Sequence, residues 1–392
     1  MLINKSLGYY KVDDLEFDSK IAACIHATKF NKDVKWIFNN DVFEKYSWNV
    51  EPAETLDQLY DIKTKELREK YDYLIISYSG GADSHNIVES FLRQGLHIDE
   101  LLINTMSEGN EKFLPVSVEN KTSHNAGASE HVLQTIPRLK EIQNRSPQTK
   151  ITIVDLSKFL FSFFDSYGDA SWIETKREGL NPLNVTRYNY LYYSEVRKKF
   201  DKDKKIAIVV GVEKPRTFIY DKNNNFYIRF ADRAANVASV NDFMHEYPNS
   251  TVEYFYWSPD SCNILCKQAH TIKRWLEINP QHQHLWIGKA QTPEMFRLVH
   301  ERLLRTLIYT TWNDSWYQAD KSTSDWYSEF DSWFIRGHAG TKTHTVWLEG
   351  IKHVQKNAEK FVNNKKGYSD GLVQFAHDYK IGPMNKLNNL KF

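Results

Sequence analysis

The chain has 392 residues, a formal net charge of +1, 41% hydrophobic residues and 26% charged residues. These values are typical of a globular protein with two domains, or with one large domain and extensions. A net charge this close to zero excludes a strong overall attraction to nucleic acid or acidic membranes. Three cysteines are too few for a disulfide framework, and neither a signal-peptide pattern nor an apolar run of membrane-spanning length occurs. We therefore expect a cytoplasmic protein with no membrane partner.

The pattern of apolar and polar segments predicts three regions. Residues 1–70 are expected to form a mixed N-terminal extension that ends in a charged helix. Residues 71–220 alternate short apolar runs with helical patterns. This alternation predicts an α/β domain with a Rossmann-like parallel sheet and helices on both faces. Its four predicted strands lie at 73–78, 101–105, 151–156 and 206–211, and its helices at 85–95, 126–145 (kinked or restarted at Pro137) and 188–200.

The pattern changes in residues 221–392, which we expect to be first mixed and then mostly helical, as a region that binds substrate or a partner. A turn at 222–225 favours a hairpin, and helices are predicted at 262–278 and 292–309. Residues 310–334 are rich in aromatic side chains, and residues 351–392 carry eight lysines against three acidic residues. Aromatic side chains can stack on bases and lysines can contact phosphates, so a nucleic-acid partner stays open beside the simpler explanation of helix core and solvated tail.

The most informative segment of the chain is Ser79-Gly80-Gly81-Ala82-Asp83-Ser84, between the first predicted strand and its helix. A glycine pair in such a turn allows the backbone to approach a ligand closely, and the amides at the start of the helix favour phosphate. Two serine hydroxyls add donors. Asp83 places a carboxylate beside the phosphate, which suits a bound Mg²⁺.

All six positions match the Ser-Gly-Gly-x-Asp-Ser PP-loop of the ATP-pyrophosphatase, or adenine nucleotide α-hydrolase-like, superfamily, which the chain resembles over about residues 70–215. The resemblance implies a HUP-type fold, ATP and Mg²⁺ as cofactors, and cleavage of ATP between the α- and β-phosphates. An acceptor is then adenylated and pyrophosphate leaves, as in a ligase. Within the superfamily the chain is most similar to PAPS reductase-like proteins, including compact phage-encoded ones, for which the host cytoplasm would be the location.

The resemblance also implies further site residues at the ends of the strands, where ligands of parallel sheets bind. The ends of the first two strands would frame the adenine. Gly211, Lys214 and Arg216 follow the fourth strand and would stabilise charge on the leaving group, with Arg187 as a further catalytic candidate and Lys176 and Arg177 as weaker ones. The adenine-framing candidates are Ile76, Ser77, Asn104, Thr105 and Met106.

Two weaker constellations have simple structural explanations. Glu130 and His131 can act as acid–base groups, but Asn125 or Ser129 capping an exposed helix explains the segment better. Cys262 and Cys266 lie close in sequence to His282 and His284 and could hold zinc, although buried thiols explain the pair better.

The absence of cysteines at certain positions disfavours several branches of the superfamily. No cysteine follows Cys266, so the cysteine motif of the reductases is absent and that activity is disfavoured. Cys262 and Cys266 fit poorly to the paired cysteines of thiolation enzymes, and Leu2 stands where a fused glutaminase needs cysteine. An adenylating enzyme and a catalytically silent nucleotide-binding module with a nucleic-acid or protein partner therefore both remain. The acceptor substrate, its nucleophile and the oligomeric state, a homo-oligomer included, stay open.

Overall fold

The structure is a computed structural model of the chain. It describes residues 5–105, 131–155, 161–162, 164–174, 196–220, 223–232, 246–287, 301–316, 339–362 and 372–385.

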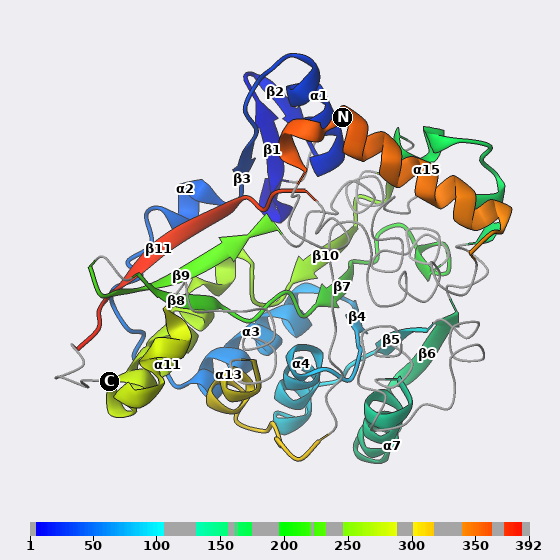
Figure 1. Cartoon of the computed structure of the whole chain (residues 1–392). Coiled ribbons are helices and arrows are strands. Elements are labelled where there is room, and N and C mark those ends of the chain that lie inside the picture. Colours follow the sequence, from blue (N-terminus) through cyan, green and yellow to red (C-terminus); the bar gives the residue numbers. More distant parts are fainter. Residues whose placement is uncertain are drawn as a thin grey trace.

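A five-stranded parallel sheet forms the centre of the molecule (Figure 1). Its strands, in spatial order, are β10 (Ser250–Tyr254), β7 (Ile206–Val210), β4 (Tyr73–Ser77), β5 (Glu100–Thr105) and β6 (Lys150–Asp155). The strand that comes first in the chain is thus central, the next two lie on one side of it and the last two on the other. This is the order of a doubly wound, Rossmann-like sheet, so the predicted α/β class is confirmed.

The apolar content of the strands explains why they occupy the centre. Leu74, Ile75 and Ile76 of β4 are fully buried, as are Ala207 and Val209 of β7. A parallel sheet that is covered on both faces requires such continuous apolar runs. β4 and β7 end in register, with Ser77 opposite Val210, so the loops that follow them start at the same level.

Three helices pack on one side of this sheet, as Figure 1 shows: α3 (Leu56–Lys70), α4 (Ala82–Arg93) and α7 (Ile136–Arg145). Thr55 and Gln58 form a capping box that starts α3. Pro137 lies in the first turn of α7, directly after a π-helical turn over His131–Thr135, which confirms that the helix restarts there. The segment that connects β6 to β7 lies largely outside the described residues. It includes most of the helix that the sequence predicts at 188–200.

Two smaller antiparallel sheets complete the described strands. The N-terminal sheet contains β1 (Tyr9–Val12), β2 (Leu15–Phe17) and β3 (Lys35–Ile37), with α1 (Lys20–Lys29) and α2 (Asn40–Phe43) beside it in the chain. The other sheet is the predicted hairpin, β8 (Arg216–Tyr220) with β9 (Asn225–Ala231), to which β11 (Ala376–Pro383) adds a third strand.

Residues 221–392 hold the remaining described helices and three of the described strands, β9, β10 and β11. The helices are α11 (Cys262–Ile278), α13 (Glu301–Ile308) and α15 (Lys342–Asn357), and the bounds of α11 are those that the sequence predicts. Short 3-10 turns occur at Lys5–Leu7, Ala170–Glu174, Pro259–Ser261, Pro280–Trp286 and Glu359–Phe361. β10 belongs to the central sheet and lies beyond residue 220, so this sheet extends past the range in which the sequence places it.

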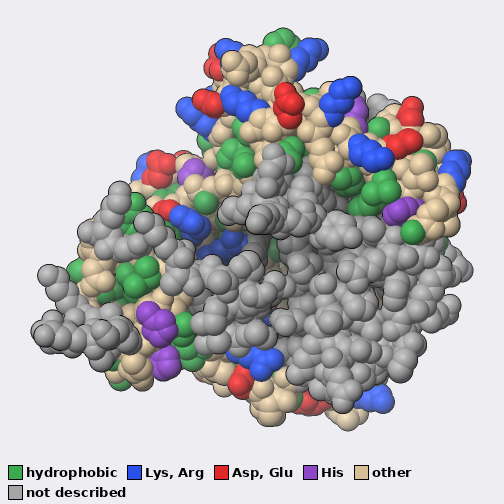
Figure 2. Space-filling view, viewed as in Figure 1, with side chains coloured by type: hydrophobic (Ala, Val, Ile, Leu, Met, Phe, Trp, Pro, Cys, Tyr) green, Lys and Arg blue, Asp and Glu red, His purple; other side chains and the backbone are tan. Residues whose placement is uncertain are grey.

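The described surface mixes both signs of charge. Figure 2 shows basic and acidic side chains interspersed over this face rather than gathered in one large basic area. None of the described helices is long and apolar enough to cross a membrane.

Candidate functional site

The loop between β4 and α4 is shaped by glycine. Gly80 has a φ of +74°, and a Cβ atom at this position would lie 2.8 Å from the Cα atom of Thr135. The neighbouring carbonyl groups are fixed from α7 and the turn before it: the Thr135 hydroxyl donates to the Ser79 carbonyl at 2.6 Å, and Arg138 donates to the Gly80 carbonyl. Only glycine fits this conformation and this close contact.

The start of α4 leaves its amide groups without a side-chain cap. Gly81 is the N-cap residue and has no side chain to accept a hydrogen bond. The Ser79 hydroxyl accepts from the Gly81 amide at 3.2 Å, and the Ser84 hydroxyl donates to the Gly81 carbonyl at 3.2 Å. The amides of the first helical turn therefore form the kind of uncapped, positively polarised group that binds anions.

The loop after β7 packs directly against this helix start. A Cβ atom on Gly211 would lie 3.2 Å from the Asp83 carbonyl carbon and 3.2 Å from the Ser84 nitrogen. The two loops thus meet at the point where the strand order of the sheet reverses, which is where ligands bind in doubly wound folds. The sequence prediction that residues after the first and fourth strands belong together agrees with this contact.

Asp83 is the charged centre of the site. The Lys214 ammonium group lies 2.7 Å from Asp83 Oδ2, and the lysine side chain is only 8% exposed. The Tyr309 hydroxyl donates to Asp83 Oδ1 at 2.5 Å. The structure therefore brings two of the predicted site residues together and adds a tyrosine that the sequence did not reveal. Tyr309 lies more than two hundred residues from Asp83 along the chain.

Three buried tyrosines surround the same helix turn. Tyr256 donates to the Asp83 carbonyl at 3.0 Å and accepts from the Asn86 amide at 3.0 Å. The ring of Tyr60 contacts both Tyr256 and Tyr309. Burial raises the pKa of Tyr256 and of Tyr309 well above the usual value, so both hydroxyls remain protonated donors.

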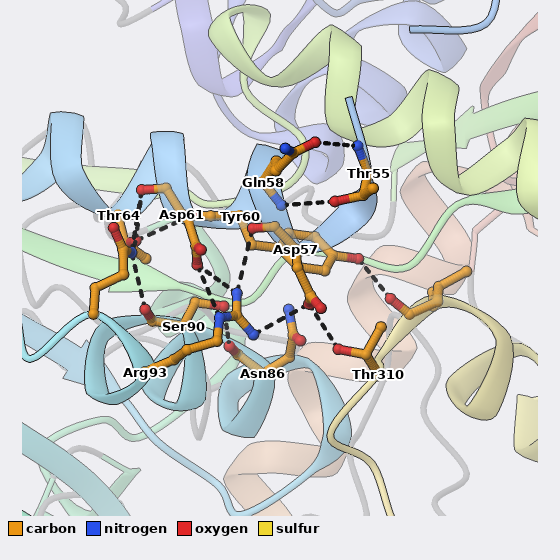
Figure 3. Close-up of polar contacts among 12 residues, drawn as sticks. Thr55, Asp57, Gln58, Tyr60, Asp61, Thr64, Asn86, Ser90, Arg93 and Thr310 are labelled. Atoms are coloured by element: carbon orange, nitrogen blue, oxygen red, sulfur yellow. Dashed lines mark hydrogen bonds and ion pairs between the residues drawn. The ribbon is translucent and has the colours of Figure 1, made fainter. Parts of the chain in front are cut away.

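The segment that carries Tyr309 is anchored on α3 and α4. Tyr60 donates to the Ile308 carbonyl at 2.8 Å, and Thr310 donates to Asp57 at 2.7 Å. Figure 3 shows that Arg93 of α4 reaches the same Asp57 carboxylate and also Asp61. The C-terminal region thus contributes to the site and does not form a separate tail at this point.

An arginine held by two tryptophans supports the loop from the side of α7. The Arg138 guanidinium lies 4.7 Å from the ring centre of Trp312 and 4.4 Å from that of Trp316. Arg138 is 5% exposed, so the cation–π contacts are largely desolvated and correspondingly stronger. Because Arg138 also binds the Gly80 carbonyl, these aromatic residues fix the loop indirectly.

Other predicted site residues are placed differently. The structure does not bring Arg216 to Asp83, because its guanidinium binds Gln374 at 3.0 Å. Asn104 lies at the end of β5 with its Oδ1 atom buried and unpartnered among the described residues. Burial lowers the pKa of His131. The candidates outside the described residues are Met106, Asn125, Ser129, Glu130, Lys176, Arg177 and Arg187.

The described residues give no support to a zinc site. All three cysteines are free and buried, and among the described residues no cluster of three or more histidine, cysteine or acidic side chains could hold a metal. Cys266 donates to the Trp48 and Val50 carbonyls instead. Burial raises the pKa of the Cys262 and Cys266 thiols to about 12, so neither is a reactive thiolate.

No protein-family model matches the chain, and no curated protein sequence is significantly similar to it.

The loop geometry predicts that two glycines differ in their tolerance of alanine. Gly80→Ala should lower the free energy of unfolding by about 1 kcal/mol for the left-handed backbone alone, and by more because the new Cβ atom meets the backbone of the turn before α7. Gly95, with a φ of +65° and no atom within 4 Å of the place that a Cβ atom would take, is the matched control. Urea denaturation of both variants measures the difference, and equal losses would contradict the close contact at Gly80.

Proposed function

We propose that the chain is an ATP-binding enzyme of the PP-loop pyrophosphatase type, with a HUP-type domain that cleaves ATP between its α- and β-phosphates. The observation that carries the proposal is the glycine-shaped loop and uncapped α4 start at the reversal point of the sheet, with Lys214 and Asp83 paired beside it. Backbone amides, two serine hydroxyls and a desolvated lysine are the groups that recognise polyphosphate.

The residues present fit a nucleotide with its metal. Mg²⁺ commonly takes one or two carboxylates and completes its shell with substrate phosphates and waters, so Asp83 suffices on the protein side. When bound, the metal would neutralise phosphate charge and orient the polyphosphate chain. The Oδ1 atom of Asn104, which has no hydrogen-bond partner in the described part of the chain, fits the amino group of an adenine. Ser77 and Thr105 lie at the same end of the sheet.

The proposed chemistry assigns distinct tasks to the chain's residues. An oxygen of the acceptor attacks the α-phosphorus, the bond from that phosphorus to the bridging oxygen breaks, and pyrophosphate leaves with the electron pair. The α4 amides, Ser79 and Ser84 hold the departing phosphates, and Lys214 stabilises the charge that builds up on them. Tyr309 and Lys214 hold the Asp83 carboxylate in place through one oxygen each.

The direct test uses ATP labelled at the α-phosphate, with Mg²⁺ and cell extract as the source of acceptor. We expect labelled AMP or an AMP adduct together with pyrophosphate, whereas labelled ADP would contradict the proposal. Asp83→Asn should reduce pyrophosphate release about 100-fold or more, because the site then loses the carboxylate that lies at the loop. Asp33→Asn, at a carboxylate whose side chain is 91% exposed, is the matched control and should leave the rate unchanged.

A second candidate, a nucleotide-binding module without turnover, is favoured by one observation. Both oxygens of Asp83 already have partners within the protein, so a metal has to compete with Lys214 and Tyr309 for this carboxylate. Binding of ATP with no release of pyrophosphate or AMP under any tested acceptor supply would establish this alternative. A PAPS reductase-like activity has less support, because the described cysteines are buried thiols.

A further inference from the structure

Two arginines face each other across the β8–β9 hairpin. The Nε and Nη2 atoms form the side-on edge of a guanidinium group, and in the described residues this edge has hydrogen-bond partners in one of the two arginines and not in the other. Arg216 of β8 is the register partner of Arg229 of β9. Arg229 uses Nε and Nη2 to bind the two carboxylate oxygens of Asp378 at 2.6 and 2.7 Å. In Arg216 the same two nitrogens are buried and have no hydrogen-bond partner among the described residues.

The remaining contact of Arg216 fixes its orientation without neutralising it. Its Nη1 atom donates to the Gln374 side chain at 3.0 Å, from the segment that leads into β11. Glutamine is uncharged, and within the described part of the chain no carboxylate pairs with Arg216. The Arg216 side chain as a whole is partly exposed, but its two buried nitrogens are costly to leave unpaired, because the desolvation of these donors is not compensated.

Arg216 lies close in the chain to a residue of the proposed phosphate site. Lys214, two residues earlier, reaches Asp83 at the start of α4. Two residues of extended chain span about 7 Å, so the backbone of Arg216 lies near that of Lys214, although the two side chains bind different partners. Figure 2 shows basic side chains set back in a hollow of this face, close to where Figure 1 draws β8 and β9.

We propose that Arg216 binds an oxyanion of the acceptor substrate, a carboxylate, phosphate or sulfate group, through Nε and Nη2. The side-on edge of a guanidinium matches two oxygens of such a group, and Arg229 with Asp378 shows this geometry in the neighbouring strand. The anion site stands on the geometry of Arg216 itself. Its assignment to the acceptor rests on the proposed function.

The test follows the Nε–H signals of the arginines by NMR while sodium acetate, phosphate or sulfate is added at constant ionic strength. The variant Arg216→Lys keeps the positive charge but has no guanidinium edge. The Nε–H signal that is missing from its spectrum is therefore that of Arg216. We expect a saturable shift of the Arg216 signal with at least one anion, and a preference for acetate or for the tetrahedral anions distinguishes the two chemical classes. Arg229→Lys is the matched control and should leave the Arg216 response unchanged, because the Arg229 edge is already filled.

ATP binding, measured separately by calorimetry, keeps the two proposals distinguishable. If ATP binds and the Arg216 signal responds to none of the three anions, the anion site is refuted while the proposed function stands. If the Arg216 signal responds but ATP does not bind, the anion site stands and its assignment to an acceptor of adenylation is refuted. If Arg216→Lys leaves a saturable response of the same size elsewhere among the arginine signals, Arg216 is not the binding residue.

Discussion

Asp232→Asn is expected to lower the free energy of unfolding by about 3–5 kcal/mol, because it removes one carboxylate of a buried ion pair. Lys20 of α1 lies 2.9 Å from Asp232, and the two side chains are 5% and 0% exposed. The same carboxylate accepts from the Tyr10 hydroxyl at 3.3 Å and from the Phe375 amide at 3.1 Å. One side chain thus joins the N-terminal sheet, the end of β9 and the segment before β11.

Urea denaturation of the wild type and the variant measures this loss. Asp33→Asn, which removes an exposed partner of Lys360, is the control and should cost less than about 1 kcal/mol. Adding Lys20→Met to Asp232→Asn should recover part of the loss, since the buried ammonium group that faced the carboxylate is then gone. A loss below about 1 kcal/mol for Asp232→Asn would show that the pair is not desolvated as the structure places it.

The sequence predicted the centre of the fold because its signals there are local. Four strands are nearly continuous apolar runs, and the loop after the first one carries its glycines and its aspartate within six residues. The fifth strand, β10, was not predicted. Its sequence Ser-Thr-Val-Glu-Tyr mixes polar and apolar residues, and its place in the sheet depends on pairing with β7 rather than on its own composition.

Of the candidate site, the sequence predicts only those residues that directly follow a strand of the sheet. Lys214 follows the fourth strand, so the topology of a doubly wound sheet brings it to the loop. Tyr309, Arg138 and Trp316 reach the same corner from segments whose position depends on tertiary packing, and no spacing in the sequence relates them to Asp83. Arg216 shows that proximity in the sequence can also mislead. It is near Lys214 in the chain, but its side chain binds Gln374 and not Asp83.

A buried histidine behind the loop makes stability depend on pH. His85, in the first half of α4, contacts the Tyr78 hydroxyl through Nδ1 at 3.1 Å and is 2% exposed. Burial, and then the nearby charges of Arg138 and Arg145, lower its pKa to about 3. The folded protein therefore keeps this ring neutral throughout the range in which an unfolded chain, with a histidine pKa of about 6.5, becomes protonated.

Between these two pKa values the unfolded chain binds more protons than the folded one, so the contribution of His85 to stability is lost as the pH falls below about 6.5. From pH 7 to pH 5 we expect this loss to be about 2 kcal/mol. His85→Gln removes the titrating group, and its unfolding free energy should fall less steeply than that of the wild type over the same interval by about that amount. Urea denaturation at pH 7, 6 and 5 measures both slopes, with His284→Gln, at an exposed histidine, as the control. Parallel pH dependence of wild type and His85→Gln would mean that the ring can be protonated in the folded state, and the loop would then have to tolerate a charge beside Arg138.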